Sequence, residues 1–197
     1  DWASGHGINV FWIDGGLWEG WKVYERILIK SLMDKDMKCG VLFGWAPWPG
    51  FIKGTVSGAP DWTIDLSLGS NKNLFRELTE NLMNSDFFSH PNYVKINNKP
   101  AIFFYDAIVF LKEKEAFTEF RNMFYNRWHV HPYVIADSAP RIPSTPGMED
   151  WYLRYKDFPY DSLSTWVGFL NLSEDEYIVR YDYYFDLMSR KYSKFAE

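Results

Sequence analysis

The sequence of 197 residues predicts a single α/β domain, spanning 1–197, in which helices cover a parallel sheet. Five short runs of the chain are almost continuously apolar, which is typical of strands buried on both faces. Between them lie stretches whose apolar residues recur at three- and four-residue spacing, as on one face of a helix. Strands that alternate with helices through right-handed crossovers form an α/β layer structure.

The five predicted strands are 8–13 (INVFWI), 39–45 (CGVLFGW), 100–105 (PAIFFY), 133–136 (YVIA) and 162–167 (SLSTWV). The predicted helices are 18–36, 72–84, 112–128 and 174–195. The stretch "HPNYVKINNKP" at 90–100 predicts a small hairpin with its turn at Asn97-Asn98.

Two long loops, 46–71 and 138–159, each begin where a predicted strand ends. In α/β folds this end of the strands carries ligand sites, so both loops are candidates for function. Their large aromatic residues favour ordered loops: Trp48, Phe51, Trp62, Trp151 and Tyr155.

The composition excludes some partners and leaves one question open. Aromatic residues make up 20% of the chain, either as core filling or as flat rings that line a groove for sugars. A net charge of −5 without a Lys/Arg block argues against nucleic acid, and no apolar run reaches the ~18 residues of a membrane span. The single cysteine, Cys39, excludes an internal disulfide framework and is expected to be a small buried residue.

Three of the five predicted strands end at an acid: Asp14, Asp106 and Asp137. The other two end at or near an indole, Trp45 and Trp166. Since the carboxyl ends of parallel strands gather on one side, we expect these groups to meet in one pocket. Paired carboxyl groups can perform general acid/base chemistry when their surroundings differ, and rings beside them can stack on a sugar. The alternative is structural, because an Asp after a strand often caps the next helix or forms an Asx turn.

The remaining motifs predict no cofactor and no metal. His129 and His131 are two residues apart, a spacing that can bind metal, but they precede a strand at the end away from the expected site. The chain has no P-loop, no Gly-x-Gly-x-x-Gly and no Gly-x-Ser-x-Gly nucleophile elbow.

Several ordered segments resemble family 99 of the glycoside hydrolases, the endo-α-mannosidase family, and its WbsX-like relatives. "YVKINNKPAIFFYDA" (93–107) is similar to the family's hairpin-and-strand segment. "GHGINVFWID" (5–14), "CGVLFGWAPW" (39–48) and "YDSLSTWV" (160–167) resemble an earlier, a second and a later strand of that family. The likeness spans most of the chain, and the order of the segments is more specific than any one of them.

The resemblance implies a (β/α)₈ TIM barrel, of which this chain would supply about five β/α units, with its site at the carboxyl ends of the strands. It implies a glycan substrate and glycosidic bond cleavage. It also implies a sugar-binding role for the strand-end residues Asp14, Trp45, Tyr105, Asp106 and Trp166, whereas Trp12 is expected to point into the sheet. Trp48 and Asp137 complete the set of expected sugar-binding residues.

The chain departs from the family in one respect. The late Asn-Glu-Trp-x-Glu-Gly type motif that carries the family's catalytic glutamates is absent from these residues, so no catalytic pair is carried over. Three alternatives stay open: a glycoside hydrolase represented by part of its barrel, a non-catalytic carbohydrate-binding or assembly protein, and a purely structural barrel portion. The opening "DWASGHG" is typical of a helix end, so we expect a fragment. A partial barrel has two sheet edges, which predicts self-association or closure by further segments.

Overall fold

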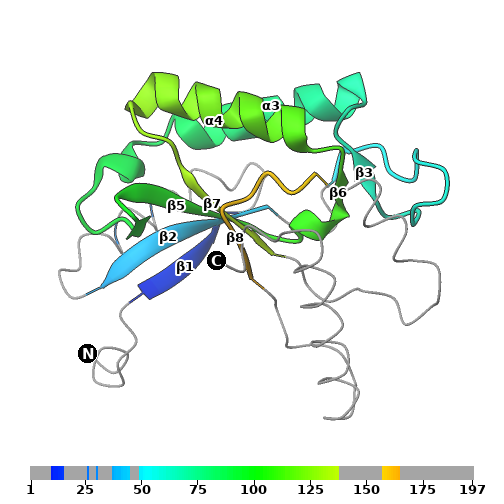
Figure 1. Ribbon diagram of the computed structural model, residues 1–197. Coiled ribbons are helices and arrows are strands. Elements are labelled where there is room, and N and C mark those ends of the chain that lie inside the picture. Colours follow the sequence, from blue (N-terminus) through cyan, green and yellow to red (C-terminus); the bar gives the residue numbers. More distant parts are fainter. Residues whose placement is uncertain are drawn as a thin grey trace, which may run out of the picture.

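The computed structural model describes residues 10–15, 26, 30, 37–44, 49–137 and 157–164. They form a mixed α/β fold around a mostly parallel sheet (Figure 1). Five parallel strands lie in the order β1 (Val10–Gly15), β2 (Lys38–Phe43), β5 (Lys99–Phe104), β7 (Tyr133–Asp137) and β8 (Ser162–Ser164). Each of these strands falls on one of the five predicted apolar runs, so the predicted fold class is confirmed at this level.

Two helices of the predicted set are described in full. They are α3 (Gly69–Met83) and α4 (Lys114–Trp128), close to the predicted 72–84 and 112–128. Of the predicted helix 18–36, only Arg26 and Lys30 are described, and both are helical. The predicted helix 174–195 lies outside the described residues.

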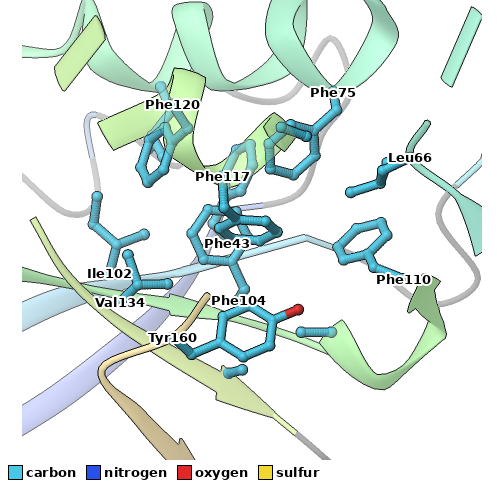
Figure 2. Packing of buried hydrophobic residues seen from close by; sticks show 14 of the residues in the cluster. Phe43, Leu66, Phe75, Ile102, Phe104, Phe110, Phe117, Phe120, Val134 and Tyr160 are labelled. Atoms are coloured by element: carbon cyan, nitrogen blue, oxygen red, sulfur yellow. The ribbon is translucent and has the colours of Figure 1, made fainter. Parts of the chain in front are cut away.

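The main core lies between one face of the sheet and these two helices, which run side by side above it (Figure 1). Figure 2 shows phenylalanine rings from sheet and helices pointing toward one another. The ring of Phe117 on α4 lies 5.0 Å from that of Phe104 on β5 and 4.9 Å from that of Phe75 on α3. Removing a ring of this size from water stabilises the fold by about 1.5–3 kcal/mol. Core filling is therefore what the aromatic residues do in this part of the chain.

The opposite face of the sheet carries a second, smaller apolar cluster. Its rings include Trp12 of β1 and Phe103 of β5, whose centroids are 5.5 Å apart. A Cβ atom at Gly40 of β2 would lie only 2.5 Å from Cζ3 of Trp12, so the indole occupies the space that a larger residue would need. The glycine inside this strand thus marks a close approach.

The predicted hairpin is confirmed. Strand β4 (Lys95–Ile96) pairs antiparallel with the start of β5, and the two turn residues, Asn97 and Asn98, have φ values of 51° and 62°. Positive φ at both central positions is the geometry of a type I′ turn, which asparagine tolerates well.

Just before the hairpin, Tyr93 joins two strands of the sheet. Its hydroxyl donates to the carbonyl of Ala101 in β5 (2.8 Å) and accepts from the amide of Val41 in β2 (3.3 Å). The paired register of these strands begins at Val41 itself and at Ile102, the residue after Ala101. The phenol therefore supplies a link between the strands where their ladder begins.

The described part of the first long loop is ordered, as its aromatic residues predict. Phe51 is buried, and Trp62 packs against the main core. The loop contains a short strand, β3 (Ile64–Asp65), which pairs in parallel with β6 (Phe110–Leu111) beyond β5. Neither strand was predicted, because two residues show no periodicity. The second long loop, 138–159, is described only from Asp157 onward.

Two 3₁₀ helices complete the described elements, η1 (Asp86–Ser89) and η2 (Ala107–Val109). Within the described ranges, no helix combines the length and the apolar character required to cross a membrane.

Candidate functional site

The parallel strands end along one side of the sheet, which we call the carboxyl edge. Asp14 is the penultimate residue of β1 and pairs in register with Leu42 of β2. Asp137 is the last residue of β7 and pairs with Ser164 of β8. Asp106 follows β5 by two residues. The backbone thus places all three predicted acids at the carboxyl edge, with β2 between the strand of Asp14 and the strand that leads to Asp106.

Two of these aspartates are in contact, through the backbone of one and the carboxyl group of the other. The backbone amide of Asp106 donates a hydrogen bond of 3.3 Å to Oδ2 of Asp137. The contact joins neighbouring strands, since β5 and β7 are paired as far as Phe104 and Ala136. Both aspartates are almost fully buried, at 2% and 1% relative exposure. Burial of a carboxyl group is costly unless its surroundings compensate, so such groups are candidates for function as well as for structure.

The local conformation of Asp106 argues against a simple capping role. Asp106 precedes η2 with φ 50° and ψ 33°, in the left-handed region, and its side chain makes no capping hydrogen bond to that helix. Left-handed backbone is unfavourable for most residues with a Cβ atom, although aspartate and asparagine tolerate it better than others. The carboxyl of Asp137 is used across the strands, toward the amide of Asp106.

Tyr105 lies between β5 and Asp106 and is half-buried. Its amide donates to the carbonyl of Phe43 (3.0 Å), which extends the β2–β5 pairing to the carboxyl edge. The structure therefore brings together Tyr105, Asp106 and Asp137 of the seven predicted residues. Trp45, Trp48 and Trp166 lie outside the described residues, as does the side chain of Asp14.

A second polar cluster, not predicted from the sequence, lies beside β6. Oδ2 of Asp65 accepts from Nζ of Lys112 (2.8 Å), and Oδ1 accepts from the amide (2.8 Å) and hydroxyl (2.6 Å) of Ser67. Burial raises the pKa of Asp65, but the hydrogen bonds from Lys112 and Ser67 outweigh it and hold that pKa below its usual value. The Asp-x-Ser spacing of 65–67 is an Asx-turn signal that could have identified part of this cluster.

A fourth buried acid, Glu113, precedes α4 and is fully covered. The hydroxyl of Tyr160 donates to its Oε1 at 3.4 Å. This contact ties the described segment 157–164 to the start of α4, where Asp157 also accepts from the amide of Lys114 (3.4 Å). Arg121 adds a third link, donating to Oδ2 of Asp161 at 2.7 Å.

The histidine pair packs on an aromatic ring. His131 stacks on the exposed Tyr125, with centroids 4.8 Å apart, and His129 meets the same ring edge-on. In the part of the chain that the structure describes, no three His, Cys, Asp or Glu side chains gather as a metal site would require. Both histidines precede β7, at the end of the sheet opposite the carboxyl edge.

A cavity of about 530 Å³ lies on the helix layer, lined by residues of α4 and by Lys72 of α3. Its charged groups neutralise one another, because Nζ of Lys72 lies 3.5 Å from Glu115 and 3.7 Å from Glu119. Long, solvent-accessible pairs of this kind contribute little to stability, in contrast to the shorter pair of Lys112 with the buried Asp65. The carboxyl edge therefore remains the better candidate for a site.

No protein-family model matches the chain, and searches of curated proteins and of solved structures found no match either.

Proposed function

We propose that the carboxyl edge of the sheet binds carbohydrate and that the protein is a carbohydrate-active enzyme of the glycoside hydrolase type. The observation that supports this most is the contact between Asp106 and Asp137 at the ends of two neighbouring strands. Two independent β-to-α junctions deliver acids to the same place, as the resemblance to family 99 leads one to expect. Carboxylates accept hydrogen bonds from sugar hydroxyls, and paired carboxyl groups carry out glycosidic bond cleavage in most glycosidase families.

We also propose that the five parallel strands belong to a larger barrel. The five parallel strands would be an arc of a (β/α)₈ barrel, in which sites lie at the carboxyl ends of the strands. In the described ladder, β1 and β8 are the two outer strands. Further segments or a second copy of the chain would pair with them, since an unpaired strand edge readily recruits another strand.

Replacing Asp106 with asparagine tests the site with little change of shape. Asparagine keeps the size of the side chain and tolerates the φ of 50°, so the substitution replaces the carboxyl group with an amide while leaving the backbone in place. We expect Asp106→Asn to weaken the binding of manno-oligosaccharides at least about tenfold, which corresponds to about 1.4 kcal/mol. Calorimetric titration measures the affinity, and thermal unfolding of the same samples should show little loss of stability.

The matched control is Asp86→Asn. Asp86 is exposed at the start of η1, between α3 and β4 and away from the carboxyl edge. This variant should bind sugar like the wild type. Equal affinity of Asp106→Asn and wild type would contradict the site, and a large drop in melting temperature would assign Asp106 a structural role instead.

A non-catalytic carbohydrate-binding protein is the second candidate, because the residues of this chain include no Asn-Glu-Trp-x-Glu-Gly type motif. Incubation with manno-oligosaccharides, followed by chromatography of the sugars, separates the two. Shortened products that disappear in Asp106→Asn support the enzyme, whereas binding without products supports the second candidate.

A further inference from the structure

The segment from Asp106 to Lys112 begins and ends with an unfavourable backbone conformation. Both residues have φ of 50°, in the left-handed region, and neither is glycine. Such conformations persist where the surrounding structure holds them, and they are common at functional sites and switch regions. The 106–112 segment also carries one of the two acids in contact at the carboxyl edge.

Each end of the 106–112 segment is held by a carboxylate from another element. At its start, the amide of Asp106 donates to Asp137 of β7. At its end, Nζ of Lys112 donates to Oδ2 of Asp65 in β3, at 2.8 Å. Between them, β6 pairs with β3, and the amide of Leu66 donates to the carbonyl of Leu111 at 3.0 Å.

The partner of Lys112 is itself fixed in place. Ser67 holds Oδ1 of Asp65 through two hydrogen bonds, which turns Oδ2 toward Lys112. The buried Asn71 of α3 donates to the carbonyls of Asp65 (3.0 Å) and Ile52 (2.8 Å), and its Oδ1 accepts from the amide of Ile52 (2.8 Å). The loop that carries Asp65 is therefore tied at three points to the start of α3.

We propose that Asp65 and Lys112 are positioning residues whose ion pair closes the 106–112 segment against β3 and thereby holds Asp106 beside Asp137. Neither side chain belongs to the contact between the two edge acids. Lys112 acts on Asp106 through the short rigid path of η2 and β6, whose residues Ile108, Phe110 and Leu111 are buried in the main core. The consequence for sugar binding rests on the proposed function, whereas the mechanical coupling does not.

Backbone amide exchange tests the coupling directly, because the amide of Asp106 is the donor in its contact with Asp137. Lys112→Met keeps a long apolar stem and removes the ammonium, and Asp65→Asn removes the opposite charge while keeping an acceptor for Ser67. We expect either variant to accelerate exchange at the amide of Asp106 at least about tenfold. Lys112→Arg retains a cation that can reach Asp65 and should restore exchange to within about threefold of the wild type.

The control is Lys72→Met, which removes the longer ion pairs of Lys72 with Glu115 (3.5 Å) and Glu119 (3.7 Å) on the helix layer. It should leave the exchange of Asp106 unchanged. The amide of Ala101 in β5 donates to the carbonyl of Val94 (3.0 Å) in a fully buried residue, so it reports on global opening and should exchange at the wild-type rate in every variant. Unchanged exchange at Asp106 in both Lys112→Met and Asp65→Asn would overturn the proposal, and so would an equal acceleration at Asp106 and Ala101.

Titration with manno-oligosaccharides separates this proposal from the proposed function. Weaker sugar binding by Lys112→Met, together with faster exchange at Asp106, supports both. If the wild type binds no sugar while the exchange pattern appears as expected, the proposed function fails and the coupling stands. Wild-type sugar affinity in Lys112→Met despite faster exchange at Asp106 would show that the ion pair does not position Asp106 for a ligand.

Discussion

Replacing Tyr93 with phenylalanine removes a single buried oxygen atom and keeps the ring. The hydroxyl accepts a hydrogen bond from the amide of Val41 and donates one to the carbonyl of Ala101. Both partner residues are buried, with relative exposures of 1% for Val41 and 0% for Ala101. The ring packs at 5.6 Å on Phe87 and 5.1 Å on Phe88, and these contacts remain in the variant. The substitution therefore isolates the link that the hydroxyl makes between β2 and β5.

The expected loss of stability follows from the two backbone groups that lose the Tyr93 hydroxyl as their hydrogen-bond partner. A buried polar group left without its hydrogen bond costs about 1–3 kcal/mol. The bond to Ala101 is short at 2.8 Å, whereas the bond from Val41 is long at 3.3 Å and contributes less. We expect Tyr93→Phe to lower the free energy of unfolding by about 2–3 kcal/mol. In a chain of this length that corresponds to roughly 5–10 °C in melting temperature.

Alkaline pH should reduce this difference. Burial raises the pKa of Tyr93 far above its usual value, against a smaller opposing effect of the hydrogen bond from Val41. The folded protein therefore keeps this phenol neutral after the unfolded chain begins to ionise near pH 10. Wild-type stability then falls relative to Tyr93→Phe by about 1.4 kcal/mol for each pH unit above about 10. The remaining tyrosines are common to both proteins and cancel in the comparison.

Urea unfolding at about pH 8 and about pH 11 measures both effects. Tyr125→Phe is the control, since Tyr125 is 45% exposed, and its change should stay within about 0.5 kcal/mol. A Tyr93→Phe variant as stable as the wild type at neutral pH would refute the bridging role of the hydroxyl. A difference that does not shrink at alkaline pH would refute the assignment of a raised pKa.

Two further predictions concern the core and the ion pair. Phe117→Ala should lower the free energy of unfolding, measured in urea, by about 3–5 kcal/mol. The reason is that this fully buried ring contacts rings of both helices, of β5 and of the segment after the second loop. A loss of stability below about 1 kcal/mol would contradict the central place of Phe117 in the core. The lowered pKa of Asp65 means that its ion pair stabilises the fold above the unfolded value near 4 and that this contribution disappears as the pH falls below it. The stability difference between wild type and Asp65→Asn should therefore narrow between about pH 5 and about pH 3, and a constant difference would contradict the assignment.

The class of the fold could be predicted because both layers leave a clear pattern in the sequence. The apolar runs of β2, β5 and β7 are buried on both faces, and α3 and α4 show helical spacing. The predicted ends of the strands were less accurate than their existence. The predicted strand 39–45 ends at Phe43, since Gly44 with φ 121° leaves the extended conformation. A run of apolar letters carries no sign of such a change in backbone direction.

The sequence predicts that Asp106 and Asp137 lie at the same edge of the sheet, but not that they are in contact. The order of elements indicates that strand ends share an edge, but not which strands are neighbours, and here β7 follows β5 directly in the sheet. The ion pair of Asp65 with Lys112 could not be predicted, because 47 residues separate the partners and the strands that align them are two residues long. Left-handed backbone at an aspartate and a lysine has no sequence signal comparable to glycine.

The register of the sheet also determines the side from which a ligand would reach the edge acids. Ile135 belongs to the cluster of Trp12 and Phe103, on the face opposite α3 and α4. Side chains alternate along a strand, so Asp137, two residues after Ile135, lies on the same face as that cluster. Trp12 packs against the sheet at Gly40 and Phe103, as predicted, and its indole lies on the face that carries Asp137. A sugar at Asp137 would therefore approach from the face of Trp12, and the helices would support the sheet from behind.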